Sequence, residues 1–335
     1  MVRILLDEVE INLKEKEDLS WLKNYGKVFC VFDQQDSGNI CFGVDDGENK
    51  KFIKYAGAKT INYKGNLEEA INRLKKSVKI YEDLQHDNLI KLIEHFQINN
   101  GYALIFEWVN GDNLHPHWKF NTYEKHNNIN SPYFKHKHMN MKNRIESINK
   151  IFEFHKYVEE KGYVAIDLYD GSIMYDDKNH VTKICDIDLY NKGYLVNEIG
   201  EEFWGSKRFK SPEEKTKAMI IDNKTNVYNL GALAFGLLGG ELDRSFEKWE
   251  VDEKLYNIAL KAVSEKKEDR YNSVWIFIMT GLEKEEIIYE LIIFIKGNLN
   301  ERGKIKKWGN CNFKRAYKRR CTSYDRLFKC NWRRK

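Results

Sequence analysis

The chain has 335 residues, of which 42% are hydrophobic and 32% charged, with 21 glycines and only three prolines. This balance is that of a soluble globular protein with an ample core, and it excludes collagen-like, low-complexity and disordered chains. The apolar stretch at 229–240 is shorter than the roughly 20 residues needed to span a bilayer. Asp7 and Glu8 interrupt the N-terminus before an apolar signal core can form. We therefore predict a cytoplasmic protein without a membrane span.

The net charge of +5 is unevenly distributed. Residues 302–335 hold 14 Lys or Arg against one acid, Asp325, so this tail carries +13 and the rest of the chain −8. Aromatic residues are interleaved with the basic ones, a composition that suits contact with a nucleic acid or an anionic membrane surface. We favour a solvated extension beyond the folded domain, because like charges at this density repel one another.

The cysteine pattern indicates no metal or disulfide framework. Six cysteines are scattered without a Cys-x-x-Cys pair, and no histidine follows His180. Structural zinc is therefore not expected, and the cysteines are predicted to be reduced thiols.

The first 108 residues predict a small sheet with one helix. Three strand-like runs between residues 27 and 56 are separated by the turn signals Asp-Ser-Gly and Asp-Asp-Gly. Apolar residues recur at helical spacing over 66–84. Two further strand-like runs, 89–98 and 102–109, are joined by Asn-Asn-Gly, which predicts a hairpin.

The rest of the chain is predicted to be mainly helical. Residues 118–139 are polar and rich in His, Asn and Lys, so we expect a long loop or insertion there. Short strands are expected within 163–187. Helices are predicted at 140–161, 212–219, 225–240, 252–264 and 273–282. The fold class is therefore α+β, with a β-rich N-terminal lobe and a larger helical lobe, an architecture that suits nucleotide binding.

Two features of the N-terminal lobe suit phosphate binding. Lys54 ends the third strand, and a strand-borne Lys that points into a cleft can pair with the α- and β-phosphates of ATP. The turn between the first two strands contains Gly38, and glycine lets backbone N–H groups approach phosphate oxygens closely. Taken singly, a surface Lys and an ordinary hairpin turn would explain both.

Two aspartates in the second half suit catalysis and metal binding. Asp167 follows a long helix, where a carboxylate can accept or orient the proton of a substrate hydroxyl. Asp186 lies nineteen residues later at a strand end. Mg²⁺ prefers carboxylate and phosphate oxygens, so Asp186, with Asp188 as a second candidate, suits a metal site. Capped turns between strands are the simpler interpretation of each aspartate alone.

Three further segments follow in order, GSKRFKSPEE (205–214), TNVYNLGALAFGLL (225–238) and KKEDRYNSV (266–274). With the motifs above, they make the chain resemble the eukaryotic-type Ser/Thr protein kinase superfamily, in a divergent, bacterial-looking form, over about residues 25–282. The resemblance implies a two-lobed protein-kinase-like fold. It divides the chain into an N-terminal extension (1–24), a kinase N-lobe (25–108), a kinase C-lobe (109–282), and a C-terminal helix and basic tail (283–335).

The resemblance also implies the site residues. Lys54 and Asp167 stand at catalytic positions, and Asp186 and Ser172 at metal-binding positions. The implied ATP-binding residues are Gly38, Ile40, Lys54, Phe106, Glu107, Val109 and Asp112. ATP and Mg²⁺ are the implied cofactors, and the implied partner is a protein substrate.

In the large lobe the resemblance implies a structural ion pair. Glu213, in Ser-Pro-Glu, should form a buried salt bridge with Arg270. Asn226 replaces the Asp that usually opens the central hydrophobic helix.

The N-lobe departs from the family's pattern at three positions. Asp33 and Gln35 replace the first two glycines of the phosphate loop, which would weaken phosphate binding. Counting back from His86 places Ser77 where the helix usually carries the Glu that pairs with Lys54.

The catalytic loop departs as well. Ile166 replaces the usual Arg, so activation by a phosphorylated loop docking on that Arg is not expected. Tyr169 replaces the usual Lys, and Ser172 the usual metal-binding Asn. Asp170 lies close enough in sequence to substitute as a metal ligand or γ-phosphate contact.

Three functions remain open at this point. We favour ATP- and Mg²⁺-dependent phosphoryl transfer to a protein Ser or Thr. A pseudokinase that binds nucleotide or acts as a scaffold would explain the missing glycines, helix Glu and loop Asn. A small-molecule kinase of the aminoglycoside or choline type shares the early motifs but not the three later segments.

Overall fold

A five-stranded antiparallel sheet forms the core of the small lobe. The structure, a computed structural model, describes residues 1–281 of the chain. The strands follow one another in space in the order β3 (Lys27–Phe32), β4 (Asn39–Asp45), β5 (Lys50–Ala56), β7 (Gly101–Glu107) and β6 (Leu92–Ile98). Each neighbouring pair is antiparallel, as the sequence predicts.

The residues predicted as an N-terminal extension share the hydrophobic core of this sheet. They form a hairpin of β1 (Val2–Leu6) and β2 (Val9–Leu13) and a short 3-10 helix, Ser20–Asn24. Asp7 and Glu8 make the hairpin turn with φ of 51° and 73°, the left-handed pair that a two-residue turn requires. Leu22, fully buried, packs with Val28 and Phe42 of the sheet.

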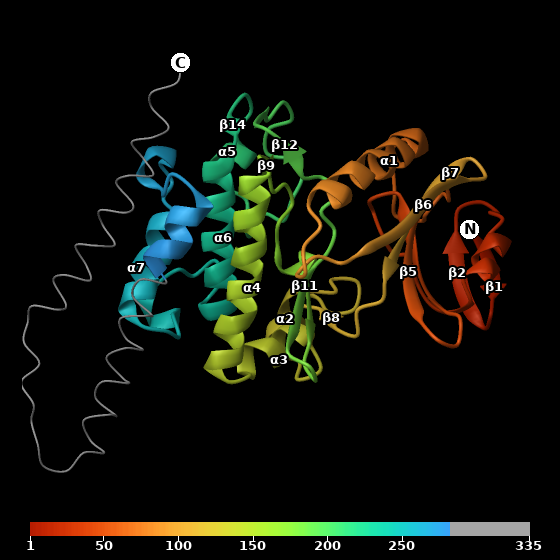
Figure 1. Ribbon diagram of the computed structural model, residues 1–335, viewed down its shortest axis with the longest axis horizontal. Helices are drawn as coiled ribbons and strands as arrows, with labels where there is room; N and C mark the ends of the chain where they lie inside the picture. Colours follow the sequence, from red (N-terminus) through yellow and green to blue (C-terminus); the bar gives the residue numbers. More distant parts are fainter. Residues whose placement is uncertain (282–335) are drawn as a thin grey trace, which may run out of the picture. The chain divides into compact units, whose positions relative to one another are not determined.

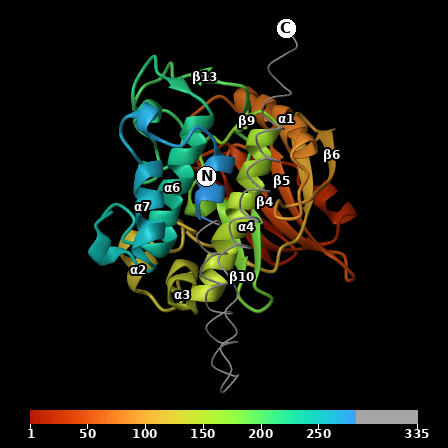
Figure 2. The same cartoon turned by 60° about the vertical axis from the view of Figure 1, so that its left-hand side comes forward.

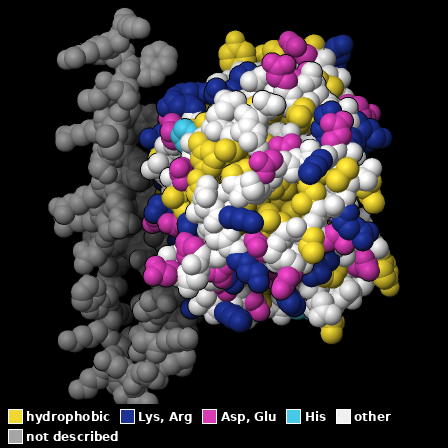
Figure 3. All heavy atoms as spheres, turned by 90° about the vertical axis from the view of Figure 1, so that its right-hand side faces the viewer, with side chains coloured by type: hydrophobic (Ala, Val, Ile, Leu, Met, Phe, Trp, Pro, Cys, Tyr) yellow, Lys and Arg dark blue, Asp and Glu magenta, His cyan; other side chains and the backbone are white. Residues whose placement is uncertain are grey.

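Helix α1 (Leu67–Asp83) covers the other face of the sheet. Asn66 caps the helix by accepting a hydrogen bond from the backbone N–H of Glu68, and this confirms the helix predicted at 66–84. Its buried residues are Ala70, Leu74, Ser77, Val78 and Tyr81. Strand β4, the second in the sheet, is buried along almost its whole length. The outward surface of the small lobe carries basic and acidic side chains interspersed (Figure 3).

The large lobe is built around two long helices, α4 (Met141–Glu160) and α6 (Asn223–Leu238), which lie side by side (Figures 1 and 2). Asp222 caps α6, and nearly every residue of α6 is buried, as the apolar run at 229–240 predicts. Helix α7 (Glu253–Ala262) packs on α6. Residues 274–281 are helical, and the C-terminal helix and basic tail predicted at 283–335 lie outside the described residues.

Short strands and turns connect these helices and carry the loops of the site. A three-stranded sheet contains β8 (Asp112–Asn113), β10 (Ile173–Asp176) and β11 (Val181–Ile184), and a two-stranded one contains β9 (Tyr163–Val164) and β12 (Asn191–Lys192). The strands predicted within 163–187 are thus confirmed: β10 has the predicted length, and β9 and β11 are shorter than their sequence runs. Short 3-10 helices lie at Asp170–Ser172, Phe246–Lys248 and Lys267–Asp269.

Two predictions for the large lobe were wrong. The segment 118–139, expected to be a loop, contains α2 (Thr122–Asn127) and α3 (Pro132–His138), because Asn121 and Ser131 supply N-caps that outweigh its polar composition. The helix expected at 212–219 ends early.

Helix α5 covers only Pro212–Lys215, and the chain then turns into β14 (Ile220–Ile221), which pairs with β13 (Leu195–Val196). Two consecutive β-branched residues favour the strand, and Ala218, with φ of 67°, interrupts the helix.

Within residues 1–281, no helix is both long enough and apolar enough to cross a bilayer. The cysteines of this region, Cys30, Cys41 and Cys185, are free.

Candidate active site

Lys54 and Asp186, 132 residues apart in sequence, meet in the structure. Lys54 lies on β5 and its side chain is buried. The Lys54 Nζ is 2.7 Å from Asp186 Oδ1 and 2.8 Å from Asp188 Oδ2. The Lys54 ammonium holds the pKa of the Asp186 carboxyl below its usual value. The structure therefore joins the predicted phosphate-binding cation to the predicted metal-binding carboxylate.

Asp188 does not lie open to a metal, contrary to the second-candidate prediction. Its Oδ1 accepts a hydrogen bond of 2.8 Å from the Tyr81 hydroxyl of α1, and its Oδ2 contacts Lys54. The Asp188 side chain is 8% exposed, whereas that of Asp186 is 48% exposed. Both oxygens of Asp188 are thus occupied by protein groups in a buried setting.

The helix position that the sequence assigns to the missing Glu is buried and carries no charge. Ser77 donates its hydroxyl to the carbonyl of Leu74 within α1. One turn further along the same buried face, Tyr81 reaches Asp188. In the sequence, Tyr81 fits the apolar positions of the predicted helix, and nothing there indicates that its hydroxyl binds Asp188.

Asp167 lies on the loop after β9, in the left-handed backbone region at φ 64°. Asp186 has the same unusual conformation, at φ 56°. Non-glycine residues rarely adopt it, and such strain is concentrated at functional sites. Burial, followed by the charges of Asp186 and Glu214, raises the pKa of Asp167 to about 8. The carboxyl of Asp167 is therefore a stronger base than an exposed aspartate.

Ser172 holds this loop by a hydrogen bond, and Lys210 places a positive charge near it. The Ser172 hydroxyl, buried, donates to the Asp167 backbone carbonyl over 3.2 Å. Lys210 donates to the backbone carbonyls of Glu201 and Phe203, and its positive charge lowers the pKa of Asp167 in opposition to burial. Sequence analysis did not single out Lys210.

Asp170 does not substitute for a missing ligand, and that prediction was wrong. Its side chain is fully buried and accepts hydrogen bonds of 2.9 Å from both terminal nitrogens of Arg208. Lys125 Nζ lies 2.6 Å from its Oδ2. A fully buried carboxylate held by two cations in this way is not available to a metal or a phosphate.

The same two cations bind Glu241, which completes a buried cluster. Lys125 Nζ is 2.6 Å from Glu241 Oε2, and Arg208 Nη1 is 2.7 Å from Glu241 Oε1. Lys125 comes from α2, in the segment that the sequence analysis interpreted as a loop. The cluster of Lys125, Asp170, Arg208 and Glu241 thus fixes the catalytic loop to the segment before α5 and to the end of α6.

Gly38 lies buried in the turn between β3 and β4, with φ of 84°. A Cβ at this position would lie 2.8 Å from Ala70 and from the Tyr63 ring, so only glycine fits. Asp33, which replaces the first loop glycine, accepts a 2.9 Å hydrogen bond from the backbone N–H of Asn12. The N-terminal hairpin therefore anchors this turn. Ile40 follows on β4, but it is fully buried with Tyr55 on the face of the sheet opposite Lys54, contrary to its predicted role in ATP binding.

The other predicted ATP-binding residues lie along the connection from β7 to β8. Phe106 is fully buried, with its ring centroid 4.9 Å from that of Tyr81. Glu107 is exposed, and its Oε1 is 2.9 Å from Lys91 Nζ. Val109 is half-buried and Asp112 exposed.

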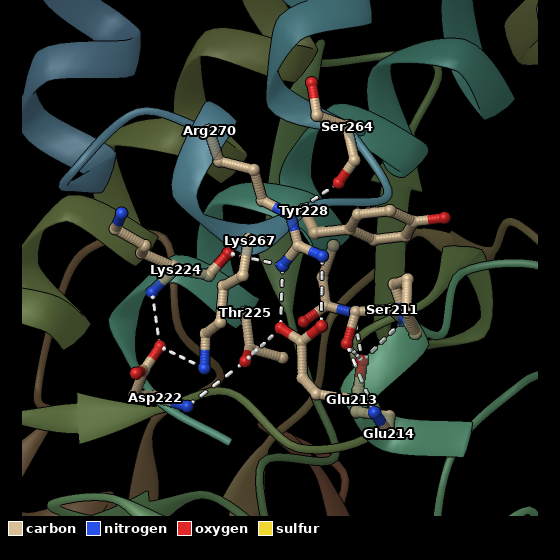
Figure 4. A network of polar contacts seen from close by, with 12 residues as sticks. Ser211, Glu213, Glu214, Asp222, Lys224, Thr225, Tyr228, Ser264, Lys267 and Arg270 are labelled. Carbon is tan, nitrogen blue, oxygen red and sulfur yellow. Dashed lines mark hydrogen bonds and ion pairs between the residues drawn. The ribbon is translucent and has the colours of Figure 1, made fainter. Parts of the chain in front are cut away.

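The predicted salt bridge in the large lobe is confirmed. Arg270 Nη1 and Nη2 lie 2.7 Å and 3.0 Å from the two oxygens of Glu213. Thr225 also donates to Glu213, and Arg270 donates to the backbone carbonyls of Ser264 and Lys224 (Figure 4). The side chains of both charged residues are at most 2% exposed.

Asn226, which replaces the usual Asp, binds two backbone groups at the start of the loop of Asp167. Its Oδ1 accepts a 2.8 Å hydrogen bond from the backbone N–H of Ala165, and its Nδ2 donates to the Tyr163 carbonyl. The central helix α6 thus holds the start of the loop that carries Asp167.

The open carboxylate fits a magnesium ion that is shared with a phosphate. Among residues 1–281 no hydrogen bond reaches Asp186 Oδ2, which leaves a hard oxygen ligand free. The same described region holds no group of three or more His, Cys, Asp or Glu side chains arranged for a metal. A bound Mg²⁺ would therefore take further oxygens from water or a phosphate, as it prefers to do.

Comparison with known proteins identifies the fold. Residues 38–302 match the family model described as "Protein kinase domain". The match therefore ends twenty residues beyond the predicted limit of 282.

Three relatives are similar over 61–64% of this chain. They are the serine/threonine-protein kinase nekl-2 of Caenorhabditis elegans (23% identical, 54% of its length), MAP kinase-interacting serine/threonine-protein kinase 2 of Xenopus laevis (22%, 47%) and calcium-dependent protein kinase 5 of Plasmodium berghei (28%, 32%). The chain thus spans about half or less of the length of these relatives. All three are eukaryotic, so the bacterial type stays a prediction.

Proposed function

The chain belongs to the protein kinase family, and on that premise we propose that it transfers the γ-phosphoryl group of ATP to a serine or threonine hydroxyl of a protein. The observation that carries the proposal is the 2.7 Å contact of Lys54 with Asp186, whose charge also acts on Asp167. Phosphoryl transfer depends mostly on positioning and on neutralising charge, so a few well-placed groups suffice. We place this activity in the cytoplasm.

In this proposal Lys54 binds the α- and β-phosphates, and Asp186 binds Mg²⁺ through its open oxygen. The turn at Gly38 covers the nucleotide. Phe106, Glu107 and Val109 border the adenine, and Asp112 approaches the ribose. Ser172 is the second metal-ligand candidate. Mg²⁺, when bound, would neutralise charge on the phosphate oxygens.

Asp167 orients the acceptor hydroxyl and accepts its proton. A pKa of about 8 supports this role, because a general base works best when its pKa lies near the working pH. Asn226 and Ser172 hold the loop through backbone groups, so the carboxyl itself is left for the substrate.

A pseudokinase is the second candidate, and one observation favours it. Both carboxylates near Lys54 bind its ammonium, so a nucleotide must compete with Asp186 for that cation. Pseudokinases keep the fold and lose turnover, so a transfer assay separates the two functions.

The test measures transfer of labelled phosphate from ATP with Mg²⁺ to mixed protein substrates, alongside Mg²⁺-dependent nucleotide binding. We expect transfer by the parent protein, weaker nucleotide binding by Lys54→Met, and nucleotide binding without transfer by Asp167→Asn. Binding without transfer by the parent would favour a pseudokinase. Undiminished binding by Lys54→Met would overturn the phosphate-site assignment. Transfer to a small alcohol or amine alone would indicate a small-molecule kinase.

A further inference from the structure

The two carboxylates that contact Lys54 are unequal partners. Asp188 is nearly closed to solvent, at 8% exposure, and Asp186 is half open, at 48%. The Lys54 side chain itself is 10% exposed. A buried ammonium without a partner is strongly unfavourable, so at least one of the two carboxylates must stay with it.

Asp188 is fixed in place by a second element. Tyr81 of α1 donates to Asp188 Oδ1 over 2.8 Å, while Lys54 of β5 holds Oδ2 at 2.8 Å. The hydroxyl of Tyr81 is buried with its ring packed against Phe106. Asp186 has no such tether among the described residues and keeps one oxygen free.

We propose that Asp188 is the permanent counter-ion of Lys54 and that its bond to Tyr81 couples the position of α1 to the active site. The inference rests on the proposed function in one respect: Asp186 is taken to turn from Lys54 to the metal when nucleotide binds. Asp188 then keeps the ammonium in place for the phosphates. A carboxylate on the loop after β11 thereby performs the task for which α1 has Ser77 in place of an acid.

Asp188 and Tyr81 are positioning residues in this account, since neither contacts the nucleotide. Their loss should therefore raise the KM for ATP and the nucleotide Kd more than it lowers kcat at saturating ATP. Loss of Asp186, a metal ligand, should instead lower kcat even at saturating ATP.

The first test compares two tyrosine hydroxyls that each join α1 to a segment of the large lobe. Tyr81→Phe removes the hydroxyl that holds Asp188. Tyr163→Phe removes a hydroxyl that donates to Asp83 at the end of the same helix over 2.7 Å, away from Lys54. We expect Tyr81→Phe to raise the ATP KM about tenfold and Tyr163→Phe to leave it within about twofold. Equal effects of the two variants would overturn the coupling through Asp188.

A rescue then tests the charge itself. Asp188→Asn preserves shape and the bond to Tyr81 but loses the anion, and should raise the ATP KM about ten- to a hundredfold. Adding Ser77→Glu, one turn before Tyr81 on the buried face of α1, should restore a large part of that loss. Asp188→Asn with an unchanged KM, or a double variant no better than Asp188→Asn, would overturn the proposal.

A third measurement needs neither ATP nor activity, so it separates failure of this inference from failure of the proposed function. Unfolding equilibria of Lys54→Met, Asp188→Asn and the double variant give the coupling between the two residues, and the same cycle is made with Asp186→Asn. We expect a coupling of more than about tenfold for Asp188 and less than about threefold for the open Asp186. A coupling to Asp186 that equals or exceeds that to Asp188 would reverse the assignment.

Discussion

The ion pairs of the large lobe and those of the cleft, by which we mean the site of Lys54, Asp186 and Asp188, both join a basic side chain to a carboxylate. They differ in how far their charged groups are exposed to solvent. Arg270 binds both oxygens of Glu213, and the exposure of either side chain is at most 2%. Asp186, in the cleft, is 48% exposed and uses one oxygen. A closed pair can only hold the fold together, whereas an open carboxylate can still take a ligand.

The balance of charge differs in the same sense. In the large-lobe cluster, the cations Lys125 and Arg208 face two acids, Asp170 and Glu241, so the cluster is neutral. In the cleft, one ammonium faces two carboxylates. The surplus negative charge suits a further cation there, and the predictions below test this division between structural and functional charges.

Replacement of the open site's base should have the largest effect. Asp167→Asn removes the carboxylate that accepts the hydroxyl proton, so the phosphotransfer rate should fall by about 10²–10⁴-fold. Initial rates with labelled ATP measure this. Asp177→Asn, an exposed aspartate in the β10–β11 turn, is the matched control and should keep the parent rate. If Asp167→Asn transfers phosphate as fast as the parent protein, Asp167 is not the base of the reaction.

Breaking the closed pair should cost stability instead. Arg270→Leu leaves the buried Glu213 carboxylate with Thr225 as its remaining side-chain donor, and the free energy of unfolding should fall by about 3–5 kcal/mol. Urea unfolding measures the loss.

The control for Arg270→Leu is a pair that is open to solvent on a helix surface. Lys150 and Glu153 are 50% and 53% exposed, so Lys150→Leu should change the free energy of unfolding by less than about 1 kcal/mol. If the two variants unfold at the same urea concentration, burial does not explain the contribution of the Glu213–Arg270 pair to stability.

The four-residue cluster should tolerate the loss of one cation better than the pair does. In Lys125→Met, Arg208 still binds Asp170 and Glu241, so we expect a loss of about 2–3 kcal/mol in the free energy of unfolding. Lys125 Nζ also lies 4.1 Å from the centroid of the Tyr133 ring, a cation–π contact that contributes to this loss. Adding Glu241→Gln should recover part of it. If Lys125→Met lowers the free energy of unfolding as much as Arg270→Leu does, Arg208 does not compensate for the missing cation.

What the sequence could predict was set by periodicity and fixed spacing. The sheet follows from strand-like runs between turn signals, α1 from apolar residues at helical spacing, and the buried helix α6 from its apolar run, all of which local sequence carries. The pairs Lys54–Asp186 and Glu213–Arg270 came from a resemblance in motif order, because nothing local tells a residue which distant partner it will meet.

What the sequence could not predict depends on tertiary contact. Tyr81 has the spacing of a core residue, and only the approach of α1 to the loop after β11 gives its hydroxyl a partner in Asp188. Lys125 lies in a polar segment that composition assigns to a loop, although a capped helix buries it completely. Asp170 had the right residue type for a ligand, and two cations from distant segments removed it from that role.

The pH dependence of stability gives the smallest effect but isolates a single group. In the folded chain the pKa of Asp167 is raised to about 8, while in the unfolded chain it returns to its usual value near 4. The folded state therefore binds the proton more tightly, and the cost of ionising Asp167 is absent below pH 4, grows between pH 4 and 8, and is complete above pH 8.

Relative to Asp167→Asn, which cannot ionise, the parent should lose at least about 1 kcal/mol of unfolding free energy between pH 5 and pH 9. Unfolding at both pH values measures this, and other titrating groups cancel in the difference between the two proteins. Mg²⁺ with a non-hydrolysable ATP analogue should shrink the difference if the cation binds Asp186, because it offsets the negative charge that faces Asp167. If the unfolding free energies of the two proteins change equally with pH, Asp167 ionises as freely in the folded chain as in water. The surplus negative charge of the cleft would then have no effect on Asp167, and this difference from the closed pairs would be lost.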